Sequence, residues 1–174
     1  GLLAVFAAAF FSLQPVVRNG FVNWDDFKYV VENSAITHLS WANAGRLFSS
    51  FYVGAYVPLT ALSFALDYRL FGLNPAGFLA TNLLLHLLTC LLVFLLVGRL
   101  SRDRLTAFAT ALLFGVHPLH VESVAWVAER KDVLATCFGL LALGAYGGYV
   151  RKRTLGRYCV VLGLFVLGLL AKPM

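Results

Sequence analysis

The chain has 174 residues, of which 60% are hydrophobic and only 13% charged, and its mean hydropathy is +0.82. A soluble domain is about half apolar and about a quarter charged, so this composition excludes an ordinary water-soluble fold. The net charge of +6 arises from two short loops described below. It therefore reports membrane orientation and not nucleic-acid binding. We expect an all-α, polytopic helical membrane protein.

Five apolar segments, separated by Gly, Pro and charged residues, are the predicted membrane spans. The run 76–98 exceeds the roughly 18 to 20 residues that cross a hydrocarbon core about 30 Å thick. The runs lack the alternation of barrel strands, and backbone groups in lipid need partners within their own segment, so helices are expected. The predicted spans cover about residues 1–17, 76–98, 105–125, 133–150 and 158–171.

An apolar run that already begins at residue 1 indicates a single membrane domain, residues 1–174, within a longer chain. A signal peptide is the alternative interpretation of residues 1–17. No basic segment opens this run and no small-x-small cleavage site precedes Arg18. An anchoring helix is therefore favoured.

The loops 99–104 and 151–157 contain seven basic residues and one acidic residue, an excess equal to the net charge of the whole chain. Short basic loops are retained on the cytoplasmic side, so both loops are predicted to be cytoplasmic. Counting crossings then places three polar regions together on the external face, which is lumenal or periplasmic. These regions are the long loop 18–75, the stretch 117–132 and the segment 171–174.

The external loop 18–75 is expected to contain short interfacial helices. The apolar stretch 56–71 is interrupted by Asp67 and Arg69 before it reaches spanning length, so we predict a short amphipathic helix at headgroup depth. Ser40 precedes the sequence WANAGRLF. It is a candidate N-cap for a second surface helix, because its hydroxyl can accept a hydrogen bond from the first turn.

The sequence NGFVNWDDFKYV in this loop places two adjacent carboxylates, Asp25 and Asp26, close to the end of the first span. Repulsion between neighbouring carboxylates raises the pKa of one of them toward the range that suits a general base. The alternative interpretation is a solvated loop, with Trp24 as an aromatic anchor and an acidic cap on a helix over residues 27–33. The residues themselves leave both interpretations open.

Two polar residues, Asn82 and His86, interrupt the second span four residues apart, which places them on one face of a helix. We expect them to form hydrogen bonds with neighbouring helices, because an unpaired polar group in lipid is costly.

The third apolar segment reaches the sequence HPLHVE after only twelve residues, 105–116, or about 18 Å of helix, which is too short to span. Either the helix continues through HPLHVE or it breaks there, and Pro118 favours a break or kink. Either way, His117, His120 and Glu122 lie near the boundary of the apolar region, where ionisable groups usually face a cavity or a partner. Three alternatives follow: a hydrogen-bonded cluster that lines a pocket, a zinc or manganese site, and simple packing of a kinked helix.

Charged residues continue immediately before the fourth span. Asp132 is placed to cap that helix, where its charge suits the N-terminus. Arg130 and Lys131 have two interpretations. They either snorkel to the interface or, with Lys172 arriving at the same face, form a phosphate-binding site beside the membrane.

The succession NGFVNWDDFKYV, YVPLTALSFALDYRLFGLNPAGFLATNLLLHLL, ALLFGVHPLHVESVAWVAERKDVLATCFGLLAL and LGLLAKPM resembles the membrane domain of the transmembrane and tetratricopeptide-repeat (TMTC) family. The resemblance extends in order over nearly the whole chain, and HPLHVESVAWVAERKD is its most specific part. It implies a GT-C glycosyltransferase fold, with tetratricopeptide repeats beyond residue 174. ERKD and AKP stand where eukaryotic members tend to have GRAD and SKE, which indicates a bacterial-like member.

For function, the resemblance implies an inverting glycosyltransferase that moves a sugar, mannose or another hexose, from a polyprenyl-phosphate carrier to an acceptor hydroxyl on the external face. An acid of the first external loop is the base in such enzymes, which corresponds to Asp25 or Asp26. We expect basic residues to stabilise the departing lipid phosphate and two acids to support them. The phosphate-binding candidates are Arg130, Lys131, Lys172, His117 and His120, and the supporting acids are Glu122 and Asp132.

No cofactor is required by this hypothesis, because fixed cations can neutralise the leaving group; a divalent metal stays an alternative. The expected partners are the polyprenyl-phosphate-linked sugar, an acceptor protein or glycan, and membrane lipids, with no nucleic acid. The expected location is the bacterial inner membrane with a periplasmic active face, or the endoplasmic reticulum membrane if the chain is eukaryotic.

Two other functions compete with the enzyme. A transporter would distribute charged groups across the depth of the bilayer, often in inverted repeats, whereas here the charges outside the two basic loops gather at one face. A non-catalytic membrane anchor for a repeat scaffold would keep the same motifs, so the sequence does not separate it from the enzyme.

Overall fold

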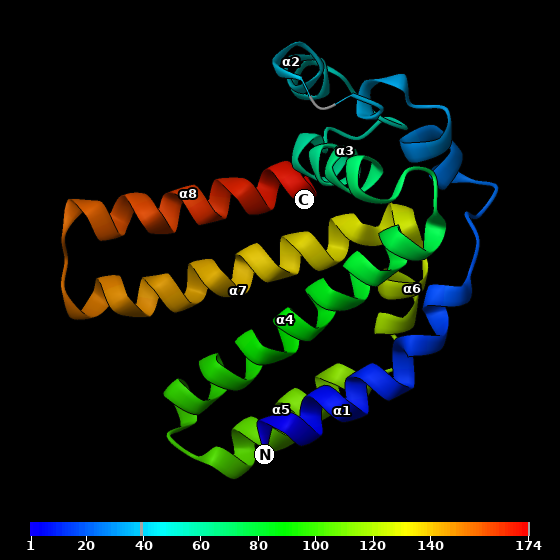
Figure 1. Ribbon diagram of the computed structural model, residues 1–174. Helices are drawn as coiled ribbons and strands as arrows, with labels where there is room; N and C mark the ends of the chain where they lie inside the picture. The colour runs from blue at the N-terminus through cyan, green and yellow to red at the C-terminus, as the bar shows by residue number, and fades with distance from the viewer. Residues whose placement is uncertain (39, 174) are drawn as a thin grey trace.

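The computed structural model describes residues 1–38 and 40–173, which form helices joined by turns and short loops (Figure 1). The predicted all-α class is confirmed, since these two ranges contain no strand. The α-helices are α1 Leu2–Leu13, α2 Trp41–Ser49, α3 Pro58–Phe71, α4 Pro75–Ser101, α5 Arg104–Val116, α6 His120–Ala125, α7 Arg130–Arg151 and α8 Leu155–Ala171. Short 3-10 or π segments are η1 Gln14–Arg18, η2 Phe27–Val31, η3 Ser34–Ile36 and η4 Val127–Glu129.

Two helical stretches, α4 and Val127–Arg151, are long and apolar enough to cross a membrane. Three further apolar stretches are shorter: Leu2–Arg18, Arg104–Val116 and Leu155–Ala171. The five stretches overlap the five apolar segments of the sequence. That all five cross the bilayer stays a prediction.

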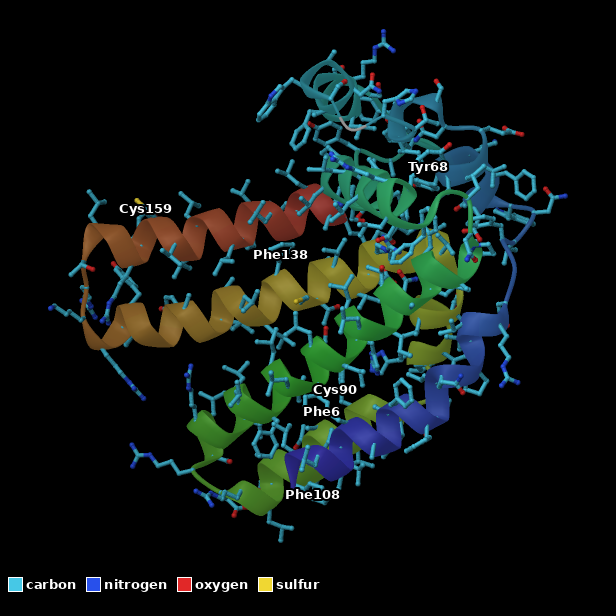
Figure 2. All side chains as sticks on the ribbon, viewed as in Figure 1. Phe6, Tyr68, Cys90, Phe108, Phe138 and Cys159 are labelled. Carbon is cyan, nitrogen blue, oxygen red and sulfur yellow. The ribbon has the colours of Figure 1, made fainter. Side chains whose placement is uncertain are left out.

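The two ends of the helix bundle differ in composition. The α4–α5 and α7–α8 turns lie at one end, and the first loop, α6 and the end of α8 lie at the other (Figure 1). In Figure 2, Tyr68 marks the first-loop end and Cys159 the opposite end of α8. The two turns carry the basic loops 99–104 and 151–157, so the other polar stretches of the sequence gather at the opposite end.

The third apolar segment breaks at Pro118, one of the two predicted forms of that segment. α5 ends at Val116, His117 is extended with φ −68° and ψ 131°, and α6 begins at His120. The ring of Pro118 disfavours helical geometry in the preceding residue, which explains where α5 ends. The break directs α6 against α1, η1 and α4.

Close packing of α1, α4 and α5 depends on Gly115. A Cβ atom added there would lie 3.1 Å from Cys90 Sγ and 3.2 Å from Ala9 Cβ, so a larger residue would push the helices apart. The Gly115 carbonyl lies 3.0 Å from His86 Nε2, which donates to it. The hydrogen bond between helices predicted for His86 is confirmed.

The helices of the first loop pack around a small apolar core that includes Tyr29 and Phe64, both fully or almost fully buried. α3 occupies the stretch predicted as a short helix. Ser40 caps α2 as predicted, because its hydroxyl accepts a hydrogen bond of 3.2 Å from the N–H of Asn43. The helix expected over residues 27–33 is the short π-helix η2. Asp26 makes no capping bond to it, so the predicted acidic cap is wrong.

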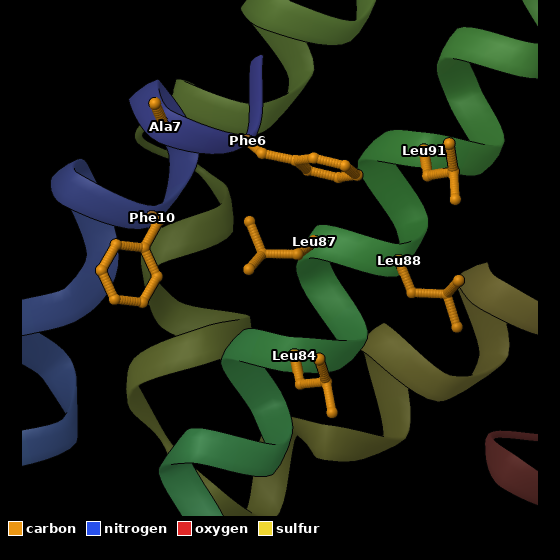
Figure 3. A pocket seen from close by; sticks show the side chains of 7 residues that line it. All are labelled: Phe6, Ala7, Phe10, Leu84, Leu87, Leu88 and Leu91. Carbon is orange, nitrogen blue, oxygen red and sulfur yellow. The ribbon is translucent and has the colours of Figure 1, made fainter. Parts of the chain in front are cut away.

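An apolar groove of about 540 Å³ lies between α1 and α4 (Figure 3). Phe6 and Phe10 line it from α1, and Leu84, Leu87 and Leu91 line it from α4. With no ionisable side chain among its lining residues, the groove suits lipid tails and offers no group for acid–base chemistry.

Candidate active site

The two adjacent carboxylates of the first loop have different surroundings. Asp26 is fully buried, and its two oxygens accept hydrogen bonds of 2.8 Å from the backbone N–H groups of Val22 and Ala128. Burial raises the pKa of Asp26, and the two N–H groups oppose this effect without cancelling it. Asp25 is partly exposed. Asp26 therefore fastens the first loop to the turn before α7, while Asp25 keeps access to the surface.

Arg130 lies in the protein interior, at the first residue of α7. It is fully buried and forms an ion pair of 2.6 Å with Asp67 of α3. It also donates to Asn82 Oδ1 at 2.7 Å and to the Phe78 carbonyl at 2.6 Å, and its Nη1 lies 3.3 Å from the Ser63 hydroxyl. A guanidinium surrounded in this way has no free face, so Arg130 contacts a lipid phosphate only if this network opens.

Asn82 extends the network toward the chain that precedes α7. Its Nδ2 donates to the carbonyls of Val124 and Trp126, at 3.4 Å and 3.1 Å. The hydrogen bonds between helices predicted for Asn82 are confirmed. Together, Asn82 and Asp26 hold the segment 124–128 in one position.

Lys131, the neighbour of Arg130, faces the first loop. Its ammonium pairs with Glu129 at 2.9 Å and lies 5.7 Å from the centre of the Tyr29 ring. Both charged side chains are more than four-fifths buried. The ammonium of Lys131 is thereby already paired with a carboxylate, and Lys131 does not line the pocket described next.

A pocket of about 520 Å³ opens between α6, α7 and α8, at the same end of the bundle. His120, Asp132 and Lys172 supply its ionisable side chains, and Phe165 and Leu169 belong to its apolar wall. Lys172 and Phe165 are seven residues apart, which places them about 10 Å apart along a helix. The pocket therefore combines a charged mouth with an apolar interior.

Lys172 and Asp132 form an ion pair at the mouth of this pocket, and both side chains are partly exposed. Asp132 does not cap α7: the N-cap position is Glu129, and it makes no side-chain capping bond. The predicted cap is wrong because α7 begins three residues earlier than a cap at Asp132 would require, and the carboxylate of Asp132 pairs with Lys172 instead. The hydroxyl of Thr60 donates to the Ala171 carbonyl at 2.9 Å and so fixes the end of α8 on α3.

The stretch HPLHVE contributes one residue to the pocket. His120 lines it and packs on Phe114, with ring centres 4.2 Å apart. His117 and Glu122 are exposed. Within residues 1–38 and 40–173, no three His, Cys, Asp or Glu side chains are arranged to hold a metal. His120 therefore lines a pocket, as the first of the three alternatives expects, whereas the hydrogen-bonded cluster of that alternative stays a prediction.

Similarity to known proteins extends over the whole chain. The protein O-mannosyl-transferase Tmtc1 of Drosophila melanogaster is 33% identical over 99% of the chain. The protein O-mannosyl-transferases TMTC1 of Mus musculus and Homo sapiens are 38% and 43% identical over 82% and 61% of it. The chain belongs to the TMTC family. It spans 21%, 16% and 12% of the lengths of these three relatives, and no family model or solved structure matches it.

The bacterial-like character suggested by ERKD and AKP stays a prediction, since the TMTC proteins compared above come from animals.

Sequence reasoning missed the role of Asp67 in this TMTC chain. On sequence alone, Asp67 interrupts the apolar stretch 56–71, but a carboxylate in such a place also usually requires a partner. The partner, Arg130, lies 63 residues further along the chain. Because that separation follows no local periodicity, only the folded arrangement of α3 and α7 identifies the pair.

Proposed function

We propose that this chain forms part of a membrane glycosyltransferase that transfers a hexose from a polyprenyl-phosphate carrier to a protein hydroxyl on the external face. The names of its relatives, protein O-mannosyl-transferases, support mannose as the sugar and protein as the acceptor. One observation carries the lipid-linked donor: the pocket between α6, α7 and α8 joins a charged mouth to an apolar interior. A polyprenyl phosphate likewise joins a charged phosphate to an apolar chain.

In this proposal Lys172 and His120 bind the phosphate, and the first isoprene units lie along Phe165 and Leu169. The ion pair with Asp132 holds Lys172 at the mouth of the pocket. As the bond between the sugar and the phosphate breaks, negative charge grows on the phosphate. A fixed ammonium stabilises that charge more in the transition state than in the ground state, which is the condition for catalysis.

Asp25 is the base in this proposal, and Asp26 is its positioning residue. A base must reach the acceptor hydroxyl, and Asp25 is the more exposed of the two carboxylates. It takes the proton of the acceptor hydroxyl while that oxygen attacks the anomeric carbon from the side opposite the phosphate, which inverts the configuration. Arg130 then has a supporting role, since it secures the start of α7 and contacts neither substrate.

The test compares Lys172→Ala with Lys131→Ala in the purified full-length protein. The assay measures mannose transfer from mannosyl-phosphoryl polyprenol to a Ser/Thr-containing peptide. Loss of a charge-assisted contact costs about 1.5–3 kcal/mol, so Lys172→Ala should lower transfer at limiting donor by about 10-fold to 100-fold. Lys131→Ala should lower it less than about threefold, because its partner Glu129 lies outside the pocket.

The unfolding temperatures of both variants serve as the control for folding. Equal transfer rates in the two variants, with both proteins folded, would remove Lys172 from the donor site and with it the proposed pocket.

A further inference from the structure

A hollow of about 410 Å³ lies on the first loop, outside the site described above. Thr37 and His38, which follow η3, line one side, and Tyr68 and Arg69 of α3 line the other. The residues described by the structure place no carboxylate within ion-pair distance of Arg69 or His38. The side chains of Arg69, His38 and Tyr68 thus line one hollow without an acidic partner, which is suitable chemistry for binding a phosphate.

The position of α3 relates this hollow to the bundle. Thr60 of α3 bonds to the end of α8, and Asp67 of α3 bonds both to Arg130 at the start of α7 and to Thr81 near the start of α4. α3 thus lies across the ends of three apolar helices. A helix placed in this way is at the level where the apolar region of a bilayer meets its headgroups.

One face of α3 has the order of side chains that suits such a boundary. Leu66 and Leu70 are 50% and 64% exposed. Because successive residues of an α-helix are about 100° apart, Leu70 lies about 40° from Leu66 toward the side of Asp67, which contacts the bundle. Arg69 lies about 60° from Leu66 in the other direction. From the bundle outward, the side chains are therefore Leu70, Leu66 and then Arg69, that is, two apolar residues followed by a basic one.

We propose that this hollow binds the phosphate of an anionic phospholipid headgroup, with the acyl chains of that lipid along Leu66 and Leu70. The exposed leucines beside Arg69 favour a lipid over a soluble anion, since a soluble anion would leave them in water. Arg69 lies about 160° around α3 from Asp67, which holds α7, so the site does not depend on the proposed transfer reaction. Its function is to anchor the first loop at the bilayer surface.

The test counts lipids bound to the detergent-purified full-length protein by native mass spectrometry. Phosphatidylglycerol and phosphatidylcholine with identical acyl chains are titrated against the wild type, Arg69→Ala, Arg69→Lys and Arg46→Ala. Arg46 is a matched control, because it is an exposed arginine of the same loop, on α2, and does not line the hollow. Loss of one charge-assisted hydrogen bond to phosphate should weaken phosphatidylglycerol binding by about tenfold in Arg69→Ala.

Arg69→Lys should retain part of the affinity because it keeps the charge, and Arg46→Ala should equal the wild type. Phosphatidylcholine binding should be the same in all four proteins. Equal phosphatidylglycerol affinity in the wild type and Arg69→Ala would overturn the proposal. So would displacement of the lipid by millimolar inorganic phosphate, which would identify a site for free anions, or a wild type that retains no phosphatidylglycerol, which would mean that another part of the protein covers the face.

Discussion

Arg130 carries its charge inside the protein, where five acceptor atoms from Asp67, Asn82, Ser63 and Phe78 surround it. Removing one partner of a buried ion pair leaves the other charge without compensation, whereas replacing both partners with apolar residues is often tolerated. The pair is thus a structural feature whose loss should affect stability before chemistry.

Arg130→Met should lower the free energy of unfolding by about 3–5 kcal/mol, because Asp67 would stay buried and unpaired. The double variant Asp67→Leu with Arg130→Met should recover most of that loss. Arg46→Met, at an exposed position, should change stability by no more than about 0.5 kcal/mol. Denaturant unfolding in detergent provides the measurement; a double variant no more stable than Arg130→Met would show that the pair is not the source of the effect.

At the scale of residues, the sequence indicated candidate side chains but not their surroundings. Asp25 and Asp26 are adjacent and identical in type, yet one is partly exposed and the other fully buried. The difference arises from Ala128, whose N–H reaches Asp26 across 102 residues of sequence. Contacts of that range depend on the folded chain and leave no local pattern.

At the scale of elements, α7 and α8 approach each other at Gly168. A Cβ atom added there would lie 3.6 Å from Phe138 Cβ and 3.8 Å from the Ala135 carbonyl oxygen, which leaves room for alanine and not for a larger side chain. Phe138 lies between the two helices (Figure 2). Gly168 also lines the proposed donor pocket, so its small size serves both packing and access.

Gly168→Leu should destabilise the protein by about 1–3 kcal/mol through overpacking and should raise the donor KM severalfold by filling the pocket. Gly163→Leu is the matched control on the same helix, because a Cβ atom there meets nothing within 4 Å. It should leave the donor KM unchanged. Donor titrations of the transfer reaction provide the measurement, and an unchanged KM in Gly168→Leu would place the donor elsewhere.

The helices could be predicted from the sequence because long apolar runs and Pro118 are local signals. The range predicted for α4 differs from the observed helix by one residue at its start and three at its end. For residues 27–33 the sequence suggested a helix, but it did not predict that this helix would be the π-helix η2. Its residues pack under α3 in the first-loop core, and that tertiary contact, which the local sequence does not encode, accompanies its irregular hydrogen bonding.

At the scale of the whole molecule, several side-chain bonds fasten the first loop to the bundle. Asp26 binds the turn before α7, and α3 binds the end of α8 through Thr60 and Ala171. Lys172 directly follows Ala171 in the sequence, and Asp132 lies four residues after Ala128, so both residues at the mouth of the pocket are close in sequence to these bonds. The fold thus holds the proposed base and the proposed phosphate site in a fixed relation at one end of the bundle.

The separation of charge between the two ends was derivable from the sequence, because it follows from counting apolar runs between basic loops. The convergence of α6, α7 and α8 into a pocket was not, since it depends on how the broken third segment packs against its neighbours. The sequence therefore indicated the end of the bundle at which these polar stretches gather, and the structure revealed the pocket in which we propose that the lipid-linked donor binds.

The most direct test of the proposed transferase is the rate at which the full-length protein transfers mannose from mannosyl-phosphoryl polyprenol to a peptide hydroxyl, in the wild type and in Asp25→Asn. A positioned base contributes about 10²-fold to 10⁴-fold to a rate. We predict transfer by the wild type, and a loss of at least about 100-fold in Asp25→Asn with unchanged donor binding and unfolding temperature. Wild-type transfer by Asp25→Asn would contradict the assignment of the base, and no transfer by the wild type would contradict the enzyme itself.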